Sequence, residues 1–273
     1  MTDAEENAAR LAHESLAAGD PTGWFERLYA AAADGLTGVP WDRRAPSPLL
    51  VQWATDRGLR AAAPTESALV VGCGLGDDAE FVSRLGFLTT AFDISPSAIR
   101  AARERFPDSP VTYRVADLLA PPASWRLGYD VVVESMTLQA LPDPPRAAAI
   151  ASLGGLVAPG GTLIVFARGR EPGGQDDGPP WSLTRAEIDA IASGSLAPVR
   201  IDELSDPAST AAWRWRAEFC RERAAGTGTG PSADSQASLG RGLEHAVRKQ
   251  SLGDQADPLG WFPDGHPAGR AVS

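Results

Sequence analysis

The residues best suited to chemistry lie in one glycine-rich stretch, Gly72–Gly76 (GCGLG), which Asp77 and Asp78 follow directly. Three glycines in five residues let the backbone turn tightly and come close to a ligand. A third acid, Asp93, ends the next apolar run, at a position where a carboxylate can bind ribose hydroxyls. This spacing predicts a site for a nucleoside-containing cofactor.

The elements that must position these residues can be read from the apolar pattern around them. Residues 68–71 form a short, β-branched run that predicts a buried strand, and the apolar spacing over residues 77–85 indicates a helix. A second apolar run over residues 88–92 leads to Asp93, after which Ser95-Pro96 favours the start of another helix. The order strand, glycine loop, helix, strand, acid, helix predicts the first half of a doubly wound sheet.

The acids after the glycines bear on which cofactor is bound. A dinucleotide fingerprint needs glycine at its sixth position, where this sequence has Asp77, with Asp78 next to it. A pyrophosphate at that helix N-terminus would face two carboxylates, at a cost of about 1 kcal/mol or more. S-adenosylmethionine has no phosphate and carries a sulfonium and an ammonium group. The acids therefore favour S-adenosylmethionine over NAD.

The motifs GCGLGDD (72–78), FDISPSAI (92–99) and Pro40-Trp41-Asp42 resemble those of class I S-adenosylmethionine-dependent methyltransferases. Within that superfamily the chain is most similar to the branch of thiopurine S-methyltransferase and the plant halide and thiol methyltransferases. The resemblance implies an α/β fold, a doubly wound, Rossmann-like seven-stranded sheet that is mostly parallel, with an antiparallel C-terminal strand and added N-terminal helices. Val70 departs from the pattern, since many members have an acid there.

The resemblance also implies a set of cofactor-binding residues. The acid after the third strand binds the adenine amino group in the family, and its neighbour contacts the ring. The family's tryptophan upstream lies beside cofactor and substrate, where an indole can hold a sulfonium by a cation–π attraction of about 0.5–2 kcal/mol. A core-packing role for this tryptophan stays open. The expected residues are Trp41, Gly72, Cys73, Gly74, Gly76, Asp93, Ile94, Asp117, Leu118 and Glu134.

Two residues are candidates for catalysis. Glu134 follows the predicted fourth strand, residues 129–133, and side chains at the carboxyl ends of such strands face the ligand crevice. Arg146 matches an arginine that the thiopurine-like branch carries near its substrate, where it would orient an anionic or polarisable acceptor. The alternatives are that Glu134 only caps a helix and that Arg146 only forms a surface salt bridge.

The chemistry of methyl transfer limits the choice of acceptor. A thiolate or halide arrives ionised, whereas a hydroxyl or carbon nucleophile usually needs a general base. No histidine occurs between Glu14 and Glu244, which leaves Asp42 and Glu134 as possible bases. We therefore expect a small thiol, thiopurine or related acceptor. The alternatives are an O- or N-methyltransferase of small metabolites and a non-catalytic cofactor-binding protein. Ser135 and Met136 replace the aromatic residue and threonine of the halide enzymes, which disfavours halide.

Composition narrows the expected partners. The 273 residues carry a net charge of −10, which argues against nucleic acid and anionic membranes. No signal peptide and no apolar run of about 18 residues is evident, so we expect a cytoplasmic protein. We also expect it to be a monomer. The only cysteines, Cys73 and Cys220, and three histidines predict neither a metal site nor a disulfide framework.

We divide the chain into three parts. Residues 1–60 are expected to form a helical lid and substrate-side segment, residues 61–223 the methyltransferase core, and residues 224–273 a low-complexity, disordered tail. The apolar face over residues 24–29 predicts core packing. The Gly/Pro-rich segment 169–181 predicts a substrate-covering loop, which Pro179, Pro180 and Trp181 would close.

Overall fold

The structure is a computed structural model that describes residues 2–63, 65–174, 178–206, 209–223 and 249–251. Its centre is an eight-stranded sheet in the order β3-β2-β1-β4-β5-β7-β6-β8. The strands are β1 (Ser67–Val71), β2 (Leu88–Asp93), β3 (Thr112–Val115), β4 (Tyr129–Ser135), β5 (Val157–Arg168), β6 (Leu196–Asp206), β7 (Ser209–Arg221) and β8 (Lys249–Ser251).

The strand directions confirm the expected topology. β1 pairs in parallel with both β2 and β4, and β4 pairs in parallel with β5. β7 is antiparallel to β5 and β6. The seven expected strands are all present, and β8 adds three residues parallel to β6. The strand order reverses at β1 and β4, which is where an open α/β sheet forms its ligand crevice.

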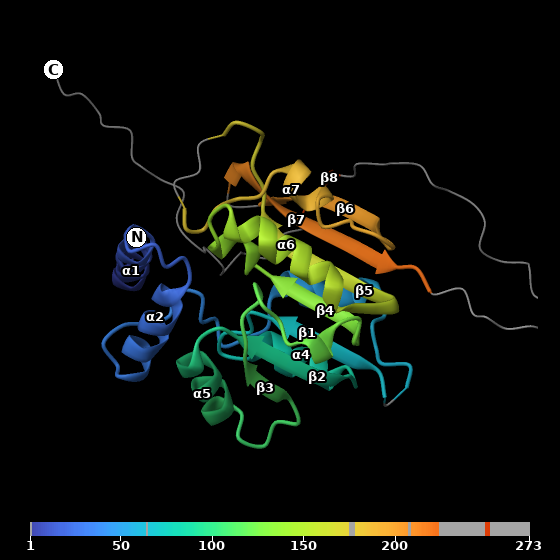
Figure 1. Ribbon diagram of the computed structural model, residues 1–273, viewed down its shortest axis with the longest axis horizontal. Coiled ribbons are helices and arrows are strands. Elements are labelled where there is room, and N and C mark those ends of the chain that lie inside the picture. Colours follow the sequence, from blue (N-terminus) through green and yellow to red (C-terminus); the bar gives the residue numbers. More distant parts are fainter. Residues whose placement is uncertain (1, 64, 175–177, 207–208, 224–248, 252–273) are drawn as a thin grey trace, which may run out of the picture.

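Helices cover both faces of the sheet (Figure 1). Residues alternate between the faces, so that Leu69 packs in one core and Val70 in the other. Because both faces are buried, these strands read as continuous apolar runs. One core holds α6 (Pro145–Leu156) and α7 (Arg185–Asp189), and the other holds α3 (Pro48–Asp56), α4 (Asp77–Arg84) and α5 (Pro96–Arg105).

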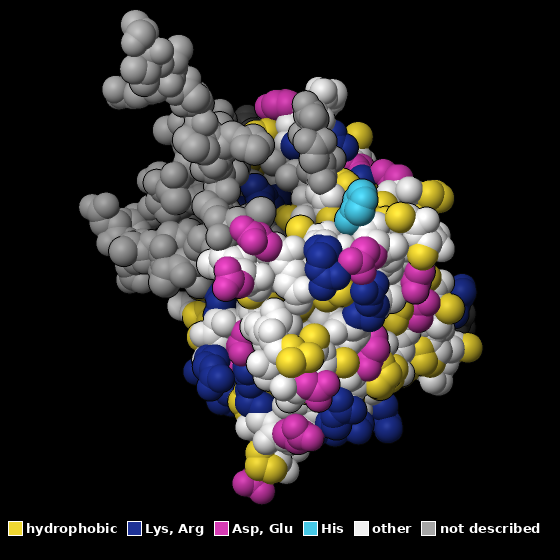
Figure 2. All heavy atoms as spheres, turned by 90° about the vertical axis from the view of Figure 1, so that its left-hand side faces the viewer, with side chains coloured by type: hydrophobic (Ala, Val, Ile, Leu, Met, Phe, Trp, Pro, Cys, Tyr) yellow, Lys and Arg dark blue, Asp and Glu magenta, His cyan; other side chains and the backbone are white. Residues whose placement is uncertain are grey.

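Two further helices, α1 (Asp3–Ala17) and α2 (Gly23–Ala33), lie beyond the ends of β4 and β5 at which their arrows point (Figure 1). They share a third apolar cluster, which includes Leu11, Trp24 and Leu28. Figure 2 shows this end of the molecule, where basic and acidic side chains are interspersed over the described part of the surface. None of the described helices is both long enough and apolar enough to cross a bilayer.

Local signals in the sequence set several element boundaries as expected. The Ser95 hydroxyl accepts a hydrogen bond from the Ala98 N–H at 3.0 Å, and Pro96 begins α5. Thr184 and Glu187 form the capping box of α7. Residues 159–161 lie within β5, at a register shift opposite β4.

β7 buries charged side chains as well as apolar ones. Trp215 and Phe219 pack in the same core as α6. The residues between them, Arg216 and Glu218, are buried as well. Arg216 pairs with Asp202 at 2.8 Å, and Glu218 accepts from the Trp53 indole N–H at 3.1 Å. Charged residues are therefore buried here because β6 and α3 supply polar partners.

The predicted tail, residues 224–273, lies outside the described residues apart from the three of β8. Two short 3₁₀ turns complete the described elements: η1 (Ala123–Trp125) and η2 (Leu138–Ala140). The second of these follows β4 directly and lies beside the cavity described next.

Candidate active site

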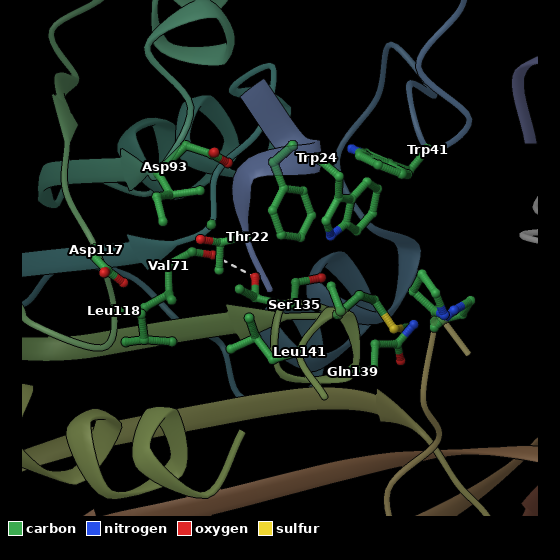
Figure 3. Close-up of a pocket in the computed structure, with 18 of the residues that line it drawn as sticks. Thr22, Trp24, Trp41, Val71, Asp93, Asp117, Leu118, Ser135, Gln139 and Leu141 are labelled. Atoms are coloured by element: carbon green, nitrogen blue, oxygen red, sulfur yellow. Dashed lines mark hydrogen bonds between the residues drawn. The ribbon is translucent and has the colours of Figure 1, made fainter. Parts of the chain in front are cut away.

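A cavity of about 140 Å³ lies at the carboxyl ends of β1, β2 and β4. Its floor includes Val71, Asp93 and Ser135, each at or next to the end of a strand. Its remaining walls come from α1, α2, η2, the loop after β3, and residues 179–180. Most of this wall is apolar. Figure 3 shows Asp93, Asp117 and Leu118 toward one end, and Trp24, Trp41 and Gln139 toward the other.

The backbone conformation and the close neighbours of the glycine loop exclude side chains at two of its positions. Gly72 and Gly74 have φ values of +57° and +50°, which L-residues rarely adopt. A Cβ on Gly74 would lie 2.8 Å from the Tyr29 hydroxyl, and one on Gly72 would overlap the Thr137 side chain. The loop thus packs closely against its neighbours, with no room for larger residues.

Asp93 connects the end of β2 to this loop. Its Oδ2 accepts from the Gly74 N–H at 2.9 Å, and its Oδ1 accepts from the Ser95 N–H at 2.9 Å. Burial raises the pKa of Asp93 to about 6, against these backbone hydrogen bonds, which favour the ionised form. The carboxylate lines the cavity while it fixes the loop, so it can present remaining lone pairs to a ligand.

The residues expected at the adenine end also line the cavity. Ile94, Asp117 and Leu118 all contribute to its wall. Asp117 is held in place because its Oδ1 accepts from the Leu119 N–H at 2.8 Å. The structure thus brings together the side chains that follow β2 and β3, as parallel strands with a common end should.

Three aromatic residues cover the cavity from the N-terminal side. Trp41 donates from Nε1 to the Tyr29 hydroxyl at 2.8 Å, and the two rings meet edge to face. Trp24 packs perpendicular to Trp41 with ring centroids 6.0 Å apart. Trp41 was expected here, but Trp24 and Tyr29 were assigned to core packing. Apolar periodicity does not distinguish a helix face that packs on a core from one that lines a cavity.

A smaller pocket of about 80 Å³ adjoins this cavity and shares Trp41 and Gly72 with it. Cys73, Gly74 and Gly76 line it with Asp77 and Asp78. Burial raises the pKa of the Cys73 thiol, which makes this cysteine a packing residue and not a nucleophile.

The acids of the smaller pocket have protein partners that the sequence did not reveal. Arg105 pairs with Asp42 at 2.7 Å and with Asp77 at 2.9 Å. Asp78 accepts from the Ser47 N–H at 2.6 Å. The expected exposed pair of carboxylates is therefore partly neutralised by Arg105. A pyrophosphate at this helix N-terminus would therefore meet less repulsion than the sequence predicts.

Asp42 is poorly placed to act as a base. Burial alone raises its pKa, but the hydrogen bonds and the charge of Arg105 outweigh this effect and lower the pKa of Asp42. Arg105 holds both of its carboxylate oxygens. A carboxylate in this environment keeps its negative charge and is a weak base.

The structure places Glu134 away from the cavity wall. Its side chain is fully buried, and its Oε1 accepts from the N–H groups of Thr137 and Leu138 at 2.6 and 2.9 Å. Burial raises the pKa of Glu134 to about 7, against these two backbone hydrogen bonds. Neither pocket is lined by this residue. The geometry matches the alternative of a cap, here on η2, more closely than a base.

Arg146 likewise does not line the cavity. Its side chain is only 4% exposed, and its Nη2 contacts Asp143 at 2.7 Å and Glu187 at 2.8 Å. Glu187 is the capping-box residue of α7, so Arg146 ties α6 to α7. The salt bridge that was the alternative to substrate binding is present, with a buried guanidinium and an exposed Asp143.

The end of the cavity away from Asp117 contains Gln139, a polar residue that the sequence pattern did not indicate. Gln139 lies in η2, and its Oε1 accepts from the Arg168 N–H at 2.8 Å. Its backbone carbonyl accepts from the Trp181 N–H at 2.6 Å, which draws the Gly/Pro-rich loop over the cavity. Pro179 and Pro180 of that loop line the cavity as expected. Within the described ranges, no group of three or more His, Cys, Asp or Glu side chains could hold a metal ion.

Known proteins resemble this chain over the same region. A family model described as a methyltransferase domain matches residues 68–161. An uncharacterized methyltransferase of Mycobacterium tuberculosis is 38% identical over 101 residues, which cover 37% of this chain and 50% of that protein. A ubiquinone biosynthesis O-methyltransferase of Xanthomonas campestris pv. campestris is 32% identical over 165 residues, covering 59% and 65%. The chain thus spans between half and two thirds of these relatives.

A solved structure supports the fold over a longer stretch. The N-methyltransferase NodS from Bradyrhizobium japonicum, in complex with S-adenosylhomocysteine, matches with a TM-score of 0.54 and 19% identity. The match covers 71% of this chain and 97% of NodS. At this identity the likeness concerns the fold alone.

The residues at the cavity fit S-adenosylmethionine. The loop leaves no room for a Cβ at Gly72 or Gly74, and Asp93 and Asp117 supply carboxylates for hydroxyl and amino groups. The aromatic side chains of Trp41 and Tyr29 provide π-faces that suit a sulfonium. Together with the match of residues 68–161 to a methyltransferase-domain model, this supports S-adenosylmethionine as the cofactor of this region.

Proposed function

We propose that this protein transfers a methyl group from S-adenosylmethionine to a small, largely apolar acceptor molecule. The observation that carries this proposal is the continuity of the cavity, which runs from Asp93 and Asp117 to Gln139 and the two prolines. One continuous space therefore has walls suited to a nucleoside at one end and to an apolar molecule at the other. A methyl donor and its acceptor need this arrangement to meet in line.

The chain's own residues align the reactants and exclude water. The cofactor supplies a methyl group that its sulfonium already activates. Asp93 and the glycine loop hold the nucleoside end, while Trp24, Tyr29 and Trp41 shield the cavity from solvent. Residues 1–60 act as a lid in this proposal, because α1 and α2 both contribute to the wall.

A sulfur nucleophile remains our first candidate at the acceptor end. Among the described residues that line the cavity, the carboxylates are Asp93 and Asp117, and both belong to the nucleoside end. Glu134 and Asp42, the two bases considered from the sequence, are held by other groups. An acceptor that arrives ionised, such as a thiolate, needs no base.

An oxygen acceptor is the second candidate, because one relative is named as an O-methyltransferase of ubiquinone biosynthesis. The pH dependence separates the two. With a thiol, the rate should rise toward the pKa of the free acceptor, and Glu134→Gln should change it little. If Glu134→Gln removes the activity and the rate follows a protein group near neutrality, Glu134 acts as a base and the thiol proposal fails.

The function is tested by calorimetry followed by an acceptor screen. We expect S-adenosylhomocysteine to bind with micromolar affinity and NAD to show no binding. The screen then uses labelled S-adenosylmethionine with thiols, thiopurines, phenols and amines. Cofactor binding without turnover on any acceptor would favour a non-catalytic cofactor-binding protein. Binding of NAD alone would contradict the proposal. The monomeric state, the cytoplasmic location and the absence of nucleic-acid or membrane partners stay predictions.

A further inference from the structure

One buried hydrogen-bond donor in the cavity wall has no protein partner. Trp24 is only 3% exposed, and its indole Nε1 has no acceptor among the described residues. Other buried tryptophans have one: Trp53 donates to Glu218 and Trp215 donates to the Leu183 carbonyl at 2.7 Å. A buried donor without an acceptor costs free energy, so such groups usually serve a ligand or a function.

The position of this donor distinguishes it from the other unpartnered indole. The Nε1 of Trp213 also lacks an acceptor among the described residues, but Trp213 does not line the cavity. Trp24 does line it, and its ring orientation is fixed. It stacks on Phe25 at 4.0 Å and meets Trp41 at an interplanar angle of 90°. These ring contacts therefore fix the direction of its N–H bond.

Figure 3 shows the Trp24 ring on the side of the cavity away from Asp117, with its nitrogen turned toward the end of β4, where Ser135 lies. The nucleoside-binding side chains Asp93 and Asp117 lie toward the opposite end. The donor therefore faces the part of the cavity that the proposed function leaves to the acceptor.

The charges around the cavity limit what the acceptor can be. No Arg, Lys or His is among the described residues that line it. An acceptor with a carboxylate or phosphate group would bury that charge without a partner, which is strongly unfavourable. Flat aromatic surfaces from Trp24, Phe25 and Trp41 favour a planar apolar molecule instead.

The geometry points to the Trp24 Nε1–H as the hydrogen-bond donor that orients the methyl acceptor. The acceptor is a planar, apolar molecule that carries a neutral oxygen or nitrogen hydrogen-bond acceptor, and no ionised group beyond the atom that is methylated. This inference rests on the proposed methyltransferase function and specifies its substrate class. Trp24 is a specificity residue here, because it contacts the acceptor without taking part in methyl transfer.

Two probes of equal shape test the donor. Quinoline and naphthalene differ by one ring nitrogen, and both are uncharged at neutral pH. They are titrated into the full chain saturated with S-adenosylhomocysteine, and indole N–H signals are followed by NMR in ¹⁵N-tryptophan-labelled protein. We expect quinoline to bind about tenfold more tightly than naphthalene, and to shift the Trp24 indole proton downfield. Trp24→Phe keeps a ring but removes the donor, so the ratio should fall to about one.

The control is Trp213→Phe, which removes the other unpartnered indole N–H outside the cavity and should leave the preference for quinoline unchanged. If Trp24→Phe does not fold, the downfield shift in the wild-type protein still tests the inference. The Trp24 indole signal is then assigned by its absence from the spectrum of Trp24→Tyr. The inference is overturned if neither bicyclic probe binds, if both bind equally, or if the anion 2-naphthoate binds more tightly than quinoline.

Calorimetry on the same samples separates this inference from the proposed function. If Trp24→Phe weakens S-adenosylhomocysteine binding and leaves the probe ratio unchanged, the N–H serves the cofactor, and only the inference fails. If wild-type protein binds no S-adenosylhomocysteine, the proposed function fails. The ratio measured without cofactor then still shows whether Trp24 donates to a ligand.

Discussion

The ends of β2 and β4 each carry a buried carboxylate that accepts two backbone N–H groups, but they use their oxygens differently. Asp93 accepts from Gly74 on Oδ2 and from Ser95 on Oδ1. Glu134 accepts both of its backbone bonds on Oε1, and its Oε2 has no partner among the described residues. Asp93 therefore bridges two segments, whereas Glu134 closes a single turn.

Their surroundings also separate the two carboxylates. Burial raises the pKa of Asp93 to about 6 and the pKa of Glu134 to about 7. Only Asp93 lines the cavity. A raised pKa at the end of a parallel strand is thus a weak guide to function by itself, because burial raises the pKa of a carboxyl group that caps a turn as well as that of one that lines a cavity.

The largest expected effect comes from filling the loop that Asp93 holds. Gly74→Val should weaken S-adenosylhomocysteine binding by more than about 100-fold, since a side chain there meets Tyr29 and strains the backbone. Gly58→Val is the matched control, because Gly58 has a φ of +58° and no atom within 4 Å of an added Cβ. Titration calorimetry with S-adenosylhomocysteine compares the affinities of the two variants with that of the wild-type protein. Wild-type affinity in a folded Gly74→Val protein would show that this loop is not the ligand cradle.

The second effect is the pH dependence of stability that Glu134 contributes. Because burial raises its pKa from 4.5 to about 7, the folded protein keeps a proton that the unfolded chain releases between these values. The contribution of Glu134 to stability is therefore fully present below about pH 4.5 and is lost, by about 3 kcal/mol, as the pH rises to about 7. Glu134→Gln should remove this slope, because its amide oxygen can still accept both N–H groups. Urea unfolding of both proteins across this pH range measures it, and equal slopes would contradict the assignment.

The third effect concerns the same amide substitution at the two strand ends. Asp93→Asn must turn its NH₂ toward either Gly74 or Ser95, so cofactor binding should weaken by about 10- to 100-fold, or about 1–3 kcal/mol. Glu134→Gln should change the affinity by less than about threefold. Titration calorimetry with S-adenosylhomocysteine compares them. An equal loss in both variants would remove the distinction between these two turns.

The smallest functional effect is expected at Arg146, which, like Glu134, does not line the cavity. Arg146→Gln should lower the free energy of unfolding by about 1–3 kcal/mol, because Glu187 loses a buried partner. KM for the acceptor found by the screen should change by less than about twofold. Arg185→Gln breaks an exposed pair with Asp189 and should cost less than about 0.5 kcal/mol. A large rise in KM for Arg146→Gln would restore a substrate-binding role.

The nucleoside end was predictable because its information is local. The glycines, the acid after the second strand and the Ser95-Pro96 helix start stand within about 25 residues, and each has a backbone reason for its position. The structure brings Asp93, Ile94, Asp117 and Leu118 to one cavity, as this order of elements implies.

The acceptor end could not be predicted because it is assembled from distant segments. Trp24, Gln139 and Pro180 are far apart in sequence and meet only through the fold. The direction of the Glu134 side chain could not be predicted for a different reason. β4 is buried on both faces, so its continuous apolar run carries no alternation that would show which face its last residues take. The ion partner Arg105 lies at the far end of α5, and no local pattern links it to Asp42.

The three aromatic residues that cover the cavity, Trp24, Tyr29 and Trp41, have an optical consequence. Trp24 and Trp41 are perpendicular and 6.0 Å apart, and Trp41 donates to the Tyr29 hydroxyl. Fluorophores at this separation exchange excitation efficiently, and indole emission responds to whatever polar or aromatic group contacts the ring. The cavity therefore contains its own emission probe. A compound that enters it should change the tryptophan spectrum of the unlabelled protein, and the change should disappear in a variant with both tryptophans replaced by phenylalanine.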